Sequence, residues 1–423
     1  MRADVIVVGL GTMGSAALDA LAQRGVRVIG LDRWAPPHER GEHAGGTRII
    51  RLAYAEGSAY VPLVRRSYEL WHDLERRRDA EARGYVAPGD RAERSDNGKQ
   101  SGGGGEAASR SRVRHASRKL LTPAGGLTLG QRAGALVSGV LAASAEHGLG
   151  CLELDAAELA ERFPWFHPGD GEVAVFDPAA GVLAPEAAID TCLGLAEAAG
   201  ARVQTGAKVT GWRADASGVV VRTSAGEVSG DRLVLCPGAG APALLGELEV
   251  PWRVDRRLQH YWRPEGDTAS FAPGRFPAWM WEYAAGAVAY GLPWQDPPGG
   301  VKAAFHHANA GPLATDPVDV DLGAAPGTVD EAVPMRDWLA ARMPALAKGE
   351  WLGTSACLYT LTPDEHFLLG PHPAHANVVV AAGFSGHGFK FLPVVGEILA
   401  DLAIDGATRH PIGMFAPGRF AGT

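Results

Sequence analysis

The N-terminal thirty residues constrain the fold more than any other segment of the chain. A short apolar run, Val5 to Val8, stops at the glycine turn Gly9-Leu10-Gly11-Thr12-Met13-Gly14, and a helical pattern follows from Met13 to Arg24. A second strand pattern, Val26 to Leu31, ends at Asp32. This order of strand, glycine turn, helix, strand and acid predicts a dinucleotide-binding βαβ unit, and therefore an α/β fold.

The residue types of this turn meet the requirements of a pyrophosphate site. Gly9 permits the tight turn, Gly11 lets the backbone approach a pyrophosphate at the helix N-terminus, and Gly14 permits close packing of the helix on the strand. Asp32 can accept hydrogen bonds from ribose hydroxyls. The motif predicts dinucleotide binding, but it does not distinguish FAD from NAD.

Composition excludes several classes of function. The chain has 423 residues, a length typical of two to three domains, and its 46% hydrophobic and 21% charged residues are typical of soluble globular proteins. The net charge of −8 argues against a general nucleic-acid binder, and no apolar run approaches the roughly 18 to 20 residues of a membrane helix. The four cysteines lack metal-ligand spacing, and the N-terminus lacks signal-peptide features. We therefore expect a cytoplasmic protein with no metal site, nucleic-acid partner or membrane anchor.

Residues 79–119 differ from the rest of the chain. They contain six acidic and nine basic residues, a run of four glycines and few large apolar side chains. Because such a segment cannot bury enough apolar area to offset the cost of ordering its backbone, we predict a disordered insertion. A tolerated surface loop is the favoured interpretation, and a segment that binds a partner or an anion is the alternative.

The remaining pattern predicts two domains built from discontinuous segments. Residues 62–77, 131–147 and 185–199 have helical patterns, and residues 253–310 hold β-type runs divided by glycine and proline turns, as in an antiparallel sheet. The predicted fold class is α/β, with a Rossmann-like nucleotide domain and a second, mostly antiparallel β-sheet domain. The approximate ranges are 1–78, 150–250 and 345–423 for the nucleotide domain, and 120–149 and 251–344 for the second domain.

Three clusters beyond the glycine turn hold candidate functional side chains. Lys302 and His306 share one face of a predicted strand, although a polar sheet surface would give the same pattern. Arg48 and Arg51 lie three apart in a loop, where solvation is the simpler interpretation. Cys357 lies in another predicted strand, and a lone cysteine is more often a small core residue than a reactive one.

Three longer sequence motifs resemble those of a known family. They are, in chain order, His43-Ala44-Gly45-Gly46-Thr47-Arg48-Ile49-Ile50-Arg51, Cys357-Leu358-Tyr359-Thr360-Leu361-Thr362-Pro363-Asp364-Glu365-His366-Phe367 and Gly383-Phe384-Ser385-Gly386-His387-Gly388-Phe389-Lys390-Phe391. Behind the N-terminal glycine turn, they strongly resemble the monomeric sarcosine oxidase and N-methyltryptophan oxidase family of FAD-dependent amine oxidases. The resemblance covers nearly the whole chain except residues 79–119.

The resemblance implies that the cofactor is FAD and that a thioether tethers it to Cys357. A thiolate is needed for such a bond, and a nearby positive charge would help to form it. The implied cofactor-binding residues are Gly9, Gly11, Thr12, Met13, Gly14, Asp32, Arg33, Thr47, Arg48, Cys357, Gly386, Gly388 and Lys390.

The resemblance also implies a substrate site. Arg51 and Lys390 would hold the substrate carboxylate, and Tyr359 and His306 would lie beside the amine. Lys302 would stabilise the negative charge that develops as oxygen is reduced. The other implied site residues are Tyr290 and Met280 in the pocket and Arg48 near the flavin ring.

The implied reaction is the oxidation of a secondary amine, foremost an N-methyl amino acid, by a monomeric enzyme. The imine product is hydrolysed to an aldehyde and an amine, and O2 is reduced to H2O2. Three alternatives stay open: a same-fold oxidase of a cyclic imino acid in a biosynthetic pathway, a catalytically inactive flavin-binding module, and a nicotinamide dehydrogenase.

The chain departs from the family pattern at several positions. Ala44 and Gly46 stand where typical members carry a second histidine and an aspartate, so turnover or substrate preference is expected to differ. Trp279 and Trp281 flank Met280 and, by strand alternation, face away from it. We therefore expect these tryptophans to pack in the core if Met280 faces the pocket.

Overall fold

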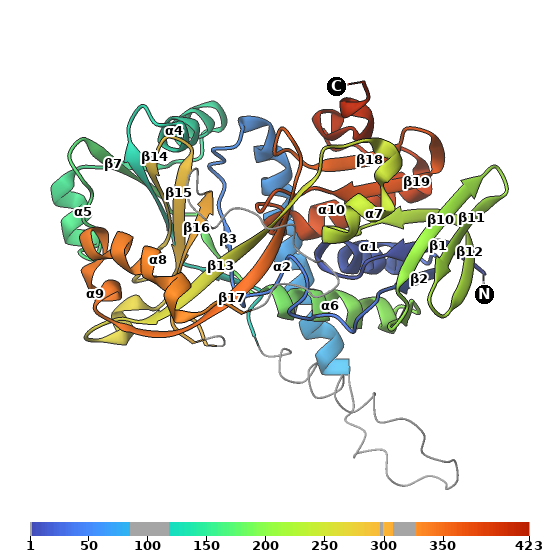
Figure 1. The fold of residues 1–423 in the computed structure, drawn as a ribbon, viewed down its shortest axis with the longest axis horizontal. Coiled ribbons are helices and arrows are strands. Elements are labelled where there is room, and N and C mark those ends of the chain that lie inside the picture. The colour runs from blue at the N-terminus through green and yellow to red at the C-terminus, as the bar shows by residue number, and fades with distance from the viewer. Residues whose placement is uncertain (1, 85–117, 297–298, 308–325, 423) are drawn as a thin grey trace, which may run out of the picture.

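The computed structural model describes residues 2–84, 118–296, 299–307 and 326–422, and it has two large sheets and one small sheet. Figure 1 shows the two large sheets side by side, with long strands and the helix α2 between them. The predicted α/β class is confirmed. Most of the predicted insertion, residues 85–117, lies outside the described residues.

The first large sheet contains the predicted nucleotide-binding unit. Its central strands are parallel, because β1 pairs with both β2 and β12, and β12 pairs in parallel with β19. Segments from both ends of the chain therefore meet in one sheet. Its strands are β1 (Arg2–Val8), β2 (Val28–Leu31), β9 (Arg202–Gln204), β10 (Val209–Asp215), β11 (Gly218–Thr223), β12 (Gly226–Leu235), β18 (Leu368–His372) and β19 (His375–Ala382).

Helices cover this sheet with a continuous apolar layer. The glycine turn leads into α1 (Thr12–Gln23), which packs against α6 (Pro185–Ala198) and α10 (Leu392–Asp405). A Cβ on Gly396 would lie 2.7 Å from the Ala16 carbonyl oxygen, so glycine allows α10 to approach α1 closely. No helix was predicted from the sequence at the position of α10. The short helix α7 (Ala241–Leu244) follows β12.

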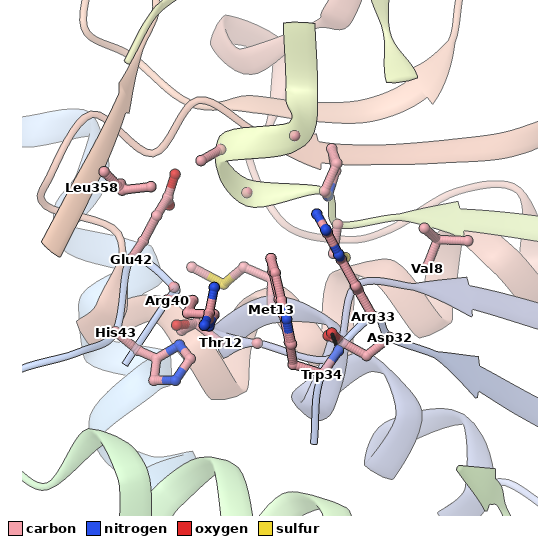
Figure 2. A pocket seen from close by; sticks show the side chains of 18 of the residues that line it. Val8, Thr12, Met13, Asp32, Arg33, Trp34, Arg40, Glu42, His43 and Leu358 are labelled. Carbon is pink, nitrogen blue, oxygen red and sulfur yellow. Dashed lines mark hydrogen bonds between the residues drawn. The ribbon is translucent and has the colours of Figure 1, made fainter. Parts of the chain in front are cut away.

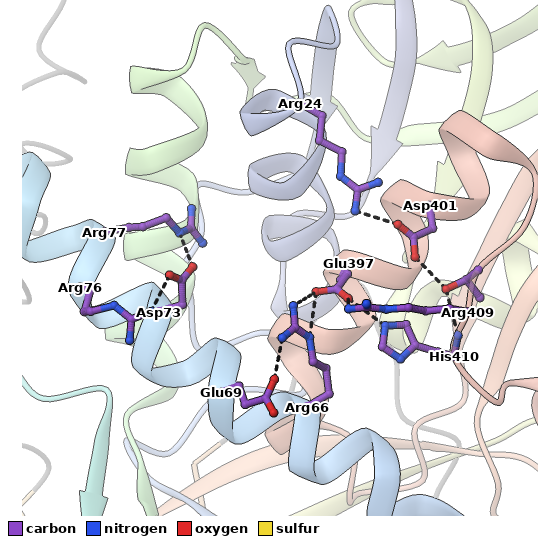
Figure 3. A network of polar contacts seen from close by, with 11 residues as sticks. Arg24, Arg66, Glu69, Asp73, Arg76, Arg77, Glu397, Asp401, Arg409 and His410 are labelled. Carbon is purple, nitrogen blue, oxygen red and sulfur yellow. Dashed lines mark hydrogen bonds and ion pairs between the residues drawn. The ribbon is translucent and has the colours of Figure 1, made fainter.

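Ion pairs join α2 (Val61–Gly84) to α10 (Figure 3). Glu397 on α10 accepts hydrogen bonds from Arg66 on α2 at 2.7 Å, from Arg409 at 3.0 Å and from His410 at 2.9 Å. The His410 hydrogen bond, with those of Arg66 and Arg409, lowers the pKa of Glu397 against the effect of burial. This network holds α2 against α10, which packs on the nucleotide sheet.

The second large sheet is antiparallel except where β14 pairs with β5. Within it, β13 and β17 form a long ribbon that runs from the second sheet toward the nucleotide sheet (Figure 1). Its strands are β5 (Gly126–Gln131), β6 (Leu152–Leu154), β7 (Glu172–Asp177), β13 (Arg253–Arg263), β14 (Ala278–Ala284), β15 (Ala287–Leu292), β16 (Val301–His307) and β17 (Glu350–Leu361). Its helices are α4 (Ala135–His147), α5 (Ala156–Arg162), α8 (Val329–Arg342) and α9 (Pro344–Ala347). The small sheet consists of β3 (Arg48–Ile50), β4 (Leu121–Pro123) and β8 (Gly181–Leu183).

A tryptophan cluster fills the core under this second sheet. Trp279 stacks on Trp338 of α8 with ring centroids 5.8 Å apart, and Trp281 meets Trp338 edge-on at 5.5 Å. Both tryptophans of β14 are fully buried, while Met280 between them lines two cavities on the other face. The prediction from strand alternation is thus confirmed.

Several element boundaries differ from the sequence predictions. The helix predicted to end near residue 77 continues to Gly84, so residues 79–84 of the predicted insertion are helical. The helix predicted from Gln131 begins at Ala135, because Gln131 still pairs in β5. The strands β6, β7 and β17 fall within the ranges predicted for the nucleotide domain, yet they pair in the second sheet. The division into two domains stays a prediction. No helix in the described part of the chain is long and apolar enough to cross a bilayer.

Candidate active site

The glycine turn forms the floor of a groove at the N-terminus of α1. Gly9 has φ of +82°, and a Cβ there would lie 2.2 Å from the Cys236 carbonyl oxygen. A Cβ on Gly14 would lie 1.7 Å from the Gly9 oxygen, whereas one on Gly11 would meet only the His43 Nδ1 atom, at 3.7 Å. Gly9 and Gly14 are thus required by packing, and Gly11 opens backbone to the groove.

The N-terminus of α1 offers an anion site. No side-chain cap bonds its first turn within the described residues, which leaves its amides available to a phosphate group. Asp32 at the end of β2 accepts the Leu10 amide at 2.7 Å and the Trp34 amide at 2.9 Å. Asp32 therefore shapes the turn as well as lining the groove.

The groove has a volume of about 690 Å³ and extends from Val8 to Leu358 of β17 (Figure 2). Nine of the predicted cofactor residues line it. They are Gly9, Gly11, Thr12, Met13, Asp32, Arg33, Arg48, Gly386 and Gly388. The groove lining does not include Gly14, which packs beneath it, nor Thr47, Cys357 and Lys390, which lie in the buried layer beyond.

The buried layer is organised by two cations. Arg48 donates to the carbonyl oxygens of Glu42, Ala44 and Thr47, at 2.8–2.9 Å, and so holds the preceding loop in shape. The Lys302 ammonium donates to Gly45 O at 2.7 Å, Thr47 O at 2.8 Å and Gln259 Oε1 at 2.6 Å. Burial, reinforced by the Arg48 charge, lowers the pKa of Lys302 well below its usual value.

Cys357 lies within this layer. Its Sγ accepts a hydrogen bond from Gln259 Nε2 at 3.0 Å, and only 1% of the residue is exposed. Burial raises the pKa of the thiol, while the charges of Arg48 and Lys302 act in the opposite direction. The positive charges expected beside the thiol are thus present, but burial has the larger effect on its pKa.

Arg51 and Lys390 form the predicted pair of cations, which we call the carboxylate clamp. Arg51 Nη2 contacts both oxygens of Glu56, at 2.9 and 2.7 Å, and Arg51 is buried. Burial alone would raise the pKa of Glu56, but the charges of Arg51 and Lys390, together with other smaller effects, outweigh it, and the pKa falls to about 2. Burial lowers the pKa of Lys390 to about 7, and Glu56 acts against that shift. The clamp therefore already binds one carboxylate, from the chain itself.

A small cavity of about 40 Å³ adjoins the clamp. His306 Nδ1 lies 3.1 Å from the Tyr359 hydroxyl, and the Tyr290 ring meets His306 edge-on. Burial raises the pKa of Tyr359 and Tyr290, so both phenols stay neutral. The predicted substrate residues thus converge: Arg48, Arg51, Met280, Tyr290, His306, Tyr359 and Lys390 all line this cavity.

A second cavity, of about 440 Å³, shares Glu56, Met280 and His306 with the small one. The two spaces are therefore neighbours, and Glu56 borders both of them.

The family departures are visible in the loop before β3. Ala44 is buried against Cys357 and Tyr359, and its carbonyl oxygen accepts hydrogen bonds from Arg48 and Gln259. The Gly46 amide donates to Glu186 Oε1 at 3.0 Å. Apolar packing of Ala44 therefore stands where typical family members carry the second histidine. The Glu186 carboxylate on α6 accepts a hydrogen bond from this loop.

Sequence reasoning missed three polar residues of the site. Gln259 links Lys302, Arg48 and Cys357, and Glu56 neutralises the clamp. Glu42 lines the groove, accepts a hydrogen bond from the Thr360 hydroxyl, and has its pKa raised to about 7 by burial. The contacts of Gln259 and Glu42 span up to 318 positions along the chain, so no local pattern signals them, whereas Glu56 lies only five residues from Arg51.

The chain is similar to known proteins along nearly its whole length. The protein family described as FAD dependent oxidoreductase (DAO) matches residues 4–402. The monomeric sarcosine oxidase of Streptomyces avermitilis is 38% identical, covering 99% of this chain and 98% of that protein. The N-methyl-L-tryptophan oxidase of Salmonella dublin is 30% identical over the whole of both chains.

Solved structures with the same fold are also similar. NikD, described as an unusual amino acid oxidase essential for nikkomycin biosynthesis, has a TM-score of 0.75 and 25% identity, covering 98% of this chain and 97% of NikD. An L-proline dehydrogenase from P. horikoshii has a TM-score of 0.76 at 21% identity, covering 99% and 98% of the two chains, and shows the fold alone. The resemblance predicted from the sequence is confirmed.

Proposed function

The chain belongs to the family of FAD-dependent oxidoreductases, and from this premise we propose that it oxidises secondary amines, foremost N-methyl amino acids. One observation carries the choice of substrate: a buried arginine and a buried lysine converge on one small cavity beside His306 and Tyr359. Two cations positioned in this way suit the carboxylate of an amino acid. The imine would be hydrolysed to an aldehyde and an amine, with O2 reduced to H2O2.

The residues of the groove fit FAD. Gly11 exposes backbone where a pyrophosphate would approach, and the N-terminus of α1 can bind it. Thr47 Oγ1 is buried and has no hydrogen-bond partner among the described residues, so a cofactor atom can satisfy it. When bound, FAD supplies an acceptor for two electrons and passes them to oxygen. Cys357, beside two cations, is our proposed point of covalent attachment.

The clamp orients the substrate. We assign the substrate carboxylate to Arg51 and Lys390, where it replaces the Glu56 carboxylate. Holding the carboxylate fixes the position of the neighbouring carbon, and restricted orientation of this kind lowers the barrier. The 440 Å³ cavity then receives the side chain of any substrate larger than sarcosine.

Tyr359 and His306 act at the amine. Their 3.1 Å contact places a hydroxyl and an imidazole nitrogen together in the small cavity. We propose that this pair accepts a proton from the substrate nitrogen, because the neutral amine is the form that can be oxidised. Activity should therefore rise toward alkaline pH until Lys390, whose pKa the bound substrate carboxylate raises, loses its proton.

Lys302 serves the reaction with oxygen. Its three acceptors favour the protonated form against the effect of burial and hold the ammonium in one position during the reaction. Such a charge stabilises negative charge as oxygen is reduced.

We further propose that the protein is a cytoplasmic monomer. The four cysteines are free, as a reducing compartment requires. Size-exclusion chromatography with light scattering tests the monomer, and a dimer would contradict it.

Peroxide release tests the proposed reaction. Purified protein is assayed with sarcosine, N-methyltryptophan, proline and pipecolate. Release with either N-methyl amino acid supports the proposal. Release with proline or pipecolate alone would instead favour a cyclic imino acid oxidase, and a yellow protein inactive on all four would favour a flavin-binding module. A colourless protein that reduces NAD would favour a nicotinamide dehydrogenase.

Acid denaturation tests the covalent bond. Flavin fluorescence should stay with the polypeptide on a denaturing gel. It should be released from Cys357→Ser, while Cys192→Ser, which changes a buried cysteine elsewhere, should retain it. Free flavin from the unaltered protein would refute the attachment.

A further inference from the structure

A chain of hydrogen bonds lies behind the carboxylate clamp. The Lys390 Nζ atom is 3.3 Å from the Tyr54 hydroxyl, and that hydroxyl is 2.6 Å from His387 Nδ1. His387 Nε2 lies 3.0 Å from the backbone carbonyl oxygen of Glu365. Tyr54 is fully buried, and His387 is 7% exposed, so no exchange with bulk solvent replaces these contacts.

The chemistry of the end groups fixes which atom donates and which accepts in each of these hydrogen bonds. The Glu365 carbonyl can only accept, so His387 Nε2 must carry a proton. Burial lowers the pKa of His387 to about 4, so the ring is neutral near pH 7 and its Nδ1 is an acceptor. Tyr54 therefore donates its hydroxyl proton to Nδ1, and its oxygen is left to accept from Lys390.

The same tyrosine also supports both cations of the clamp. Its ring centroid lies 4.9 Å from the Arg51 guanidinium carbon and 5.0 Å from Lys390 Nζ. A second acceptor, the His387 carbonyl oxygen, lies 2.8 Å from Lys390 Nζ. An ammonium has three N–H donors, so two are fixed by Tyr54 and His387 and the third is left for the cavity.

We infer that Tyr54 and His387 are positioning residues for the carboxylate clamp: their directed hydrogen bonds keep Lys390 protonated and aim its remaining proton at the substrate carboxylate. This inference rests on the proposed function, since it assumes that the clamp binds a carboxylate. It adds two residues that act through Lys390, and of these His387 also borders the small cavity.

Other charges also act on Lys390, and the test must separate them. Arg51 and Glu56 come from the segment between β3 and α2, and His387 comes from the loop of Lys390 itself. The other titratable or charged side chains of the same cavity are Arg48, Tyr290, His306 and Tyr359. A Tyr54→Phe change leaves all of these in place and removes one acceptor from the ammonium.

The neighbouring Tyr60 provides a matched control. Its ring lies 4.8 Å from that of Tyr54 in the same fully buried aromatic cluster. Its hydroxyl bonds His366 Nδ1 at 2.9 Å instead of Lys390. Tyr60→Phe therefore removes the same atom from the same core without touching the clamp.

Acetate binding to the holoenzyme, followed by the visible absorbance of the flavin, is the first measurement. Acetate stays ionised between about pH 6 and pH 9, so its pH dependence reports the clamp. We expect Tyr54→Phe to weaken binding about tenfold at pH 7 and to shift the loss of binding by about one pH unit toward acid. Tyr60→Phe should behave as the unaltered protein. Equal effects of the two changes, or none from Tyr54→Phe, would overturn the inference.

Steady-state kinetics and a second variant complete the test. Tyr54→Phe should raise KM for sarcosine about tenfold and change kcat less than about twofold. His387→Leu should act in the same direction, and the double variant should be no worse than Tyr54→Phe, because both residues act through one chain. Additive effects would contradict this. Absent turnover in a protein that still binds acetate would refute the proposed function while leaving the positioning pair intact.

Discussion

The ion pair between Arg51 and Glu56 in the clamp leads to our first prediction. Removal of the Glu56 charge should tighten substrate binding. Arg51 donates through Nη2 to Glu56 and through Nη1 to the Ala53 carbonyl oxygen at 2.6 Å. A substrate carboxylate must therefore compete with Glu56 for the guanidinium. Glu56→Gln keeps a hydrogen-bond acceptor beside Arg51 but removes its charge.

The size of the effect follows from the two kinds of hydrogen bond. A hydrogen bond to a charged group contributes about 1.5–3 kcal/mol, and a neutral one about 0.5–1.5 kcal/mol. Replacing Glu56 by glutamine thus weakens the competitor by about 1 kcal/mol. This corresponds to roughly fivefold tighter binding of a substrate carboxylate.

The pH dependence of the gain has a definite sign. Glu56 raises the pKa of Lys390 against the larger effect of burial, which brings it to about 7. Without Glu56, the lysine loses its proton at a lower pH. The gain in Glu56→Gln should therefore be complete below about pH 6 and should shrink as pH rises through 7, since a neutral amine does not attract a carboxylate.

The assay compares acetate affinity, KM for sarcosine and thermal stability at two pH values. The free variant should lose about 2 kcal/mol of stability, because buried Arg51 is left with no compensating charge, and acetate should restore most of it. Glu282→Gln is the control, since Glu282 lines the neighbouring cavity and bonds only backbone amides among the described contacts. A higher KM in Glu56→Gln, together with an unchanged melting temperature, would refute the reasoning.

Two further predictions concern Lys302 and Glu397. Lys302→Met should slow the reaction of the reduced enzyme with O2 about 100-fold, while the rate of anaerobic reduction by sarcosine changes only a few-fold. Stopped-flow absorbance measures both rates. Equal losses in the two steps would contradict the assigned role of Lys302. Glu397→Gln should lower the free energy of unfolding by about 1–2 kcal/mol, because it weakens contacts to Arg66, Arg409 and His410. The folded pKa of Glu397 is depressed, so its contribution is complete above the unfolded value of about 4.3 and is lost as pH falls below it. Urea unfolding of both proteins at neutral and acid pH measures the difference, which should vanish in acid, and a constant difference would refute the linkage.

Local sequence patterns predicted the parts of the fold that depend on neighbours in the chain. The glycine turn at Gly9 and the burial of Trp279 and Trp281 follow from backbone sterics and strand alternation, and both are confirmed. The helix α10 was missed. Its acidic residues Glu397, Asp401 and Asp405 lie four positions apart, on one helix face, so the pattern of an amphipathic helix was present and was overlooked.

The site required information that the sequence does not display locally. The resemblance placed Arg51 and Lys390 at the substrate, and the structure brings both to one cavity. It did not indicate that Glu56 occupies the clamp, or that Gln259 joins Lys302 to Cys357. The contacts of Gln259 arise where β13, β16 and β17 meet the loop before β3, and only tertiary packing creates them, whereas Glu56 lies five residues from Arg51 in the segment after β3.

The central claim is that a cationic clamp holds an amino acid for oxidation, and anaerobic reduction of the flavin tests it most directly. Sarcosine should bleach the visible absorbance of the purified protein, whereas dimethylamine, which lacks the carboxylate, should do so at least about 100-fold more slowly. Equal rates with the two amines, or absorbance that persists with sarcosine, N-methyltryptophan and the cyclic imino acids alike, would contradict the claim.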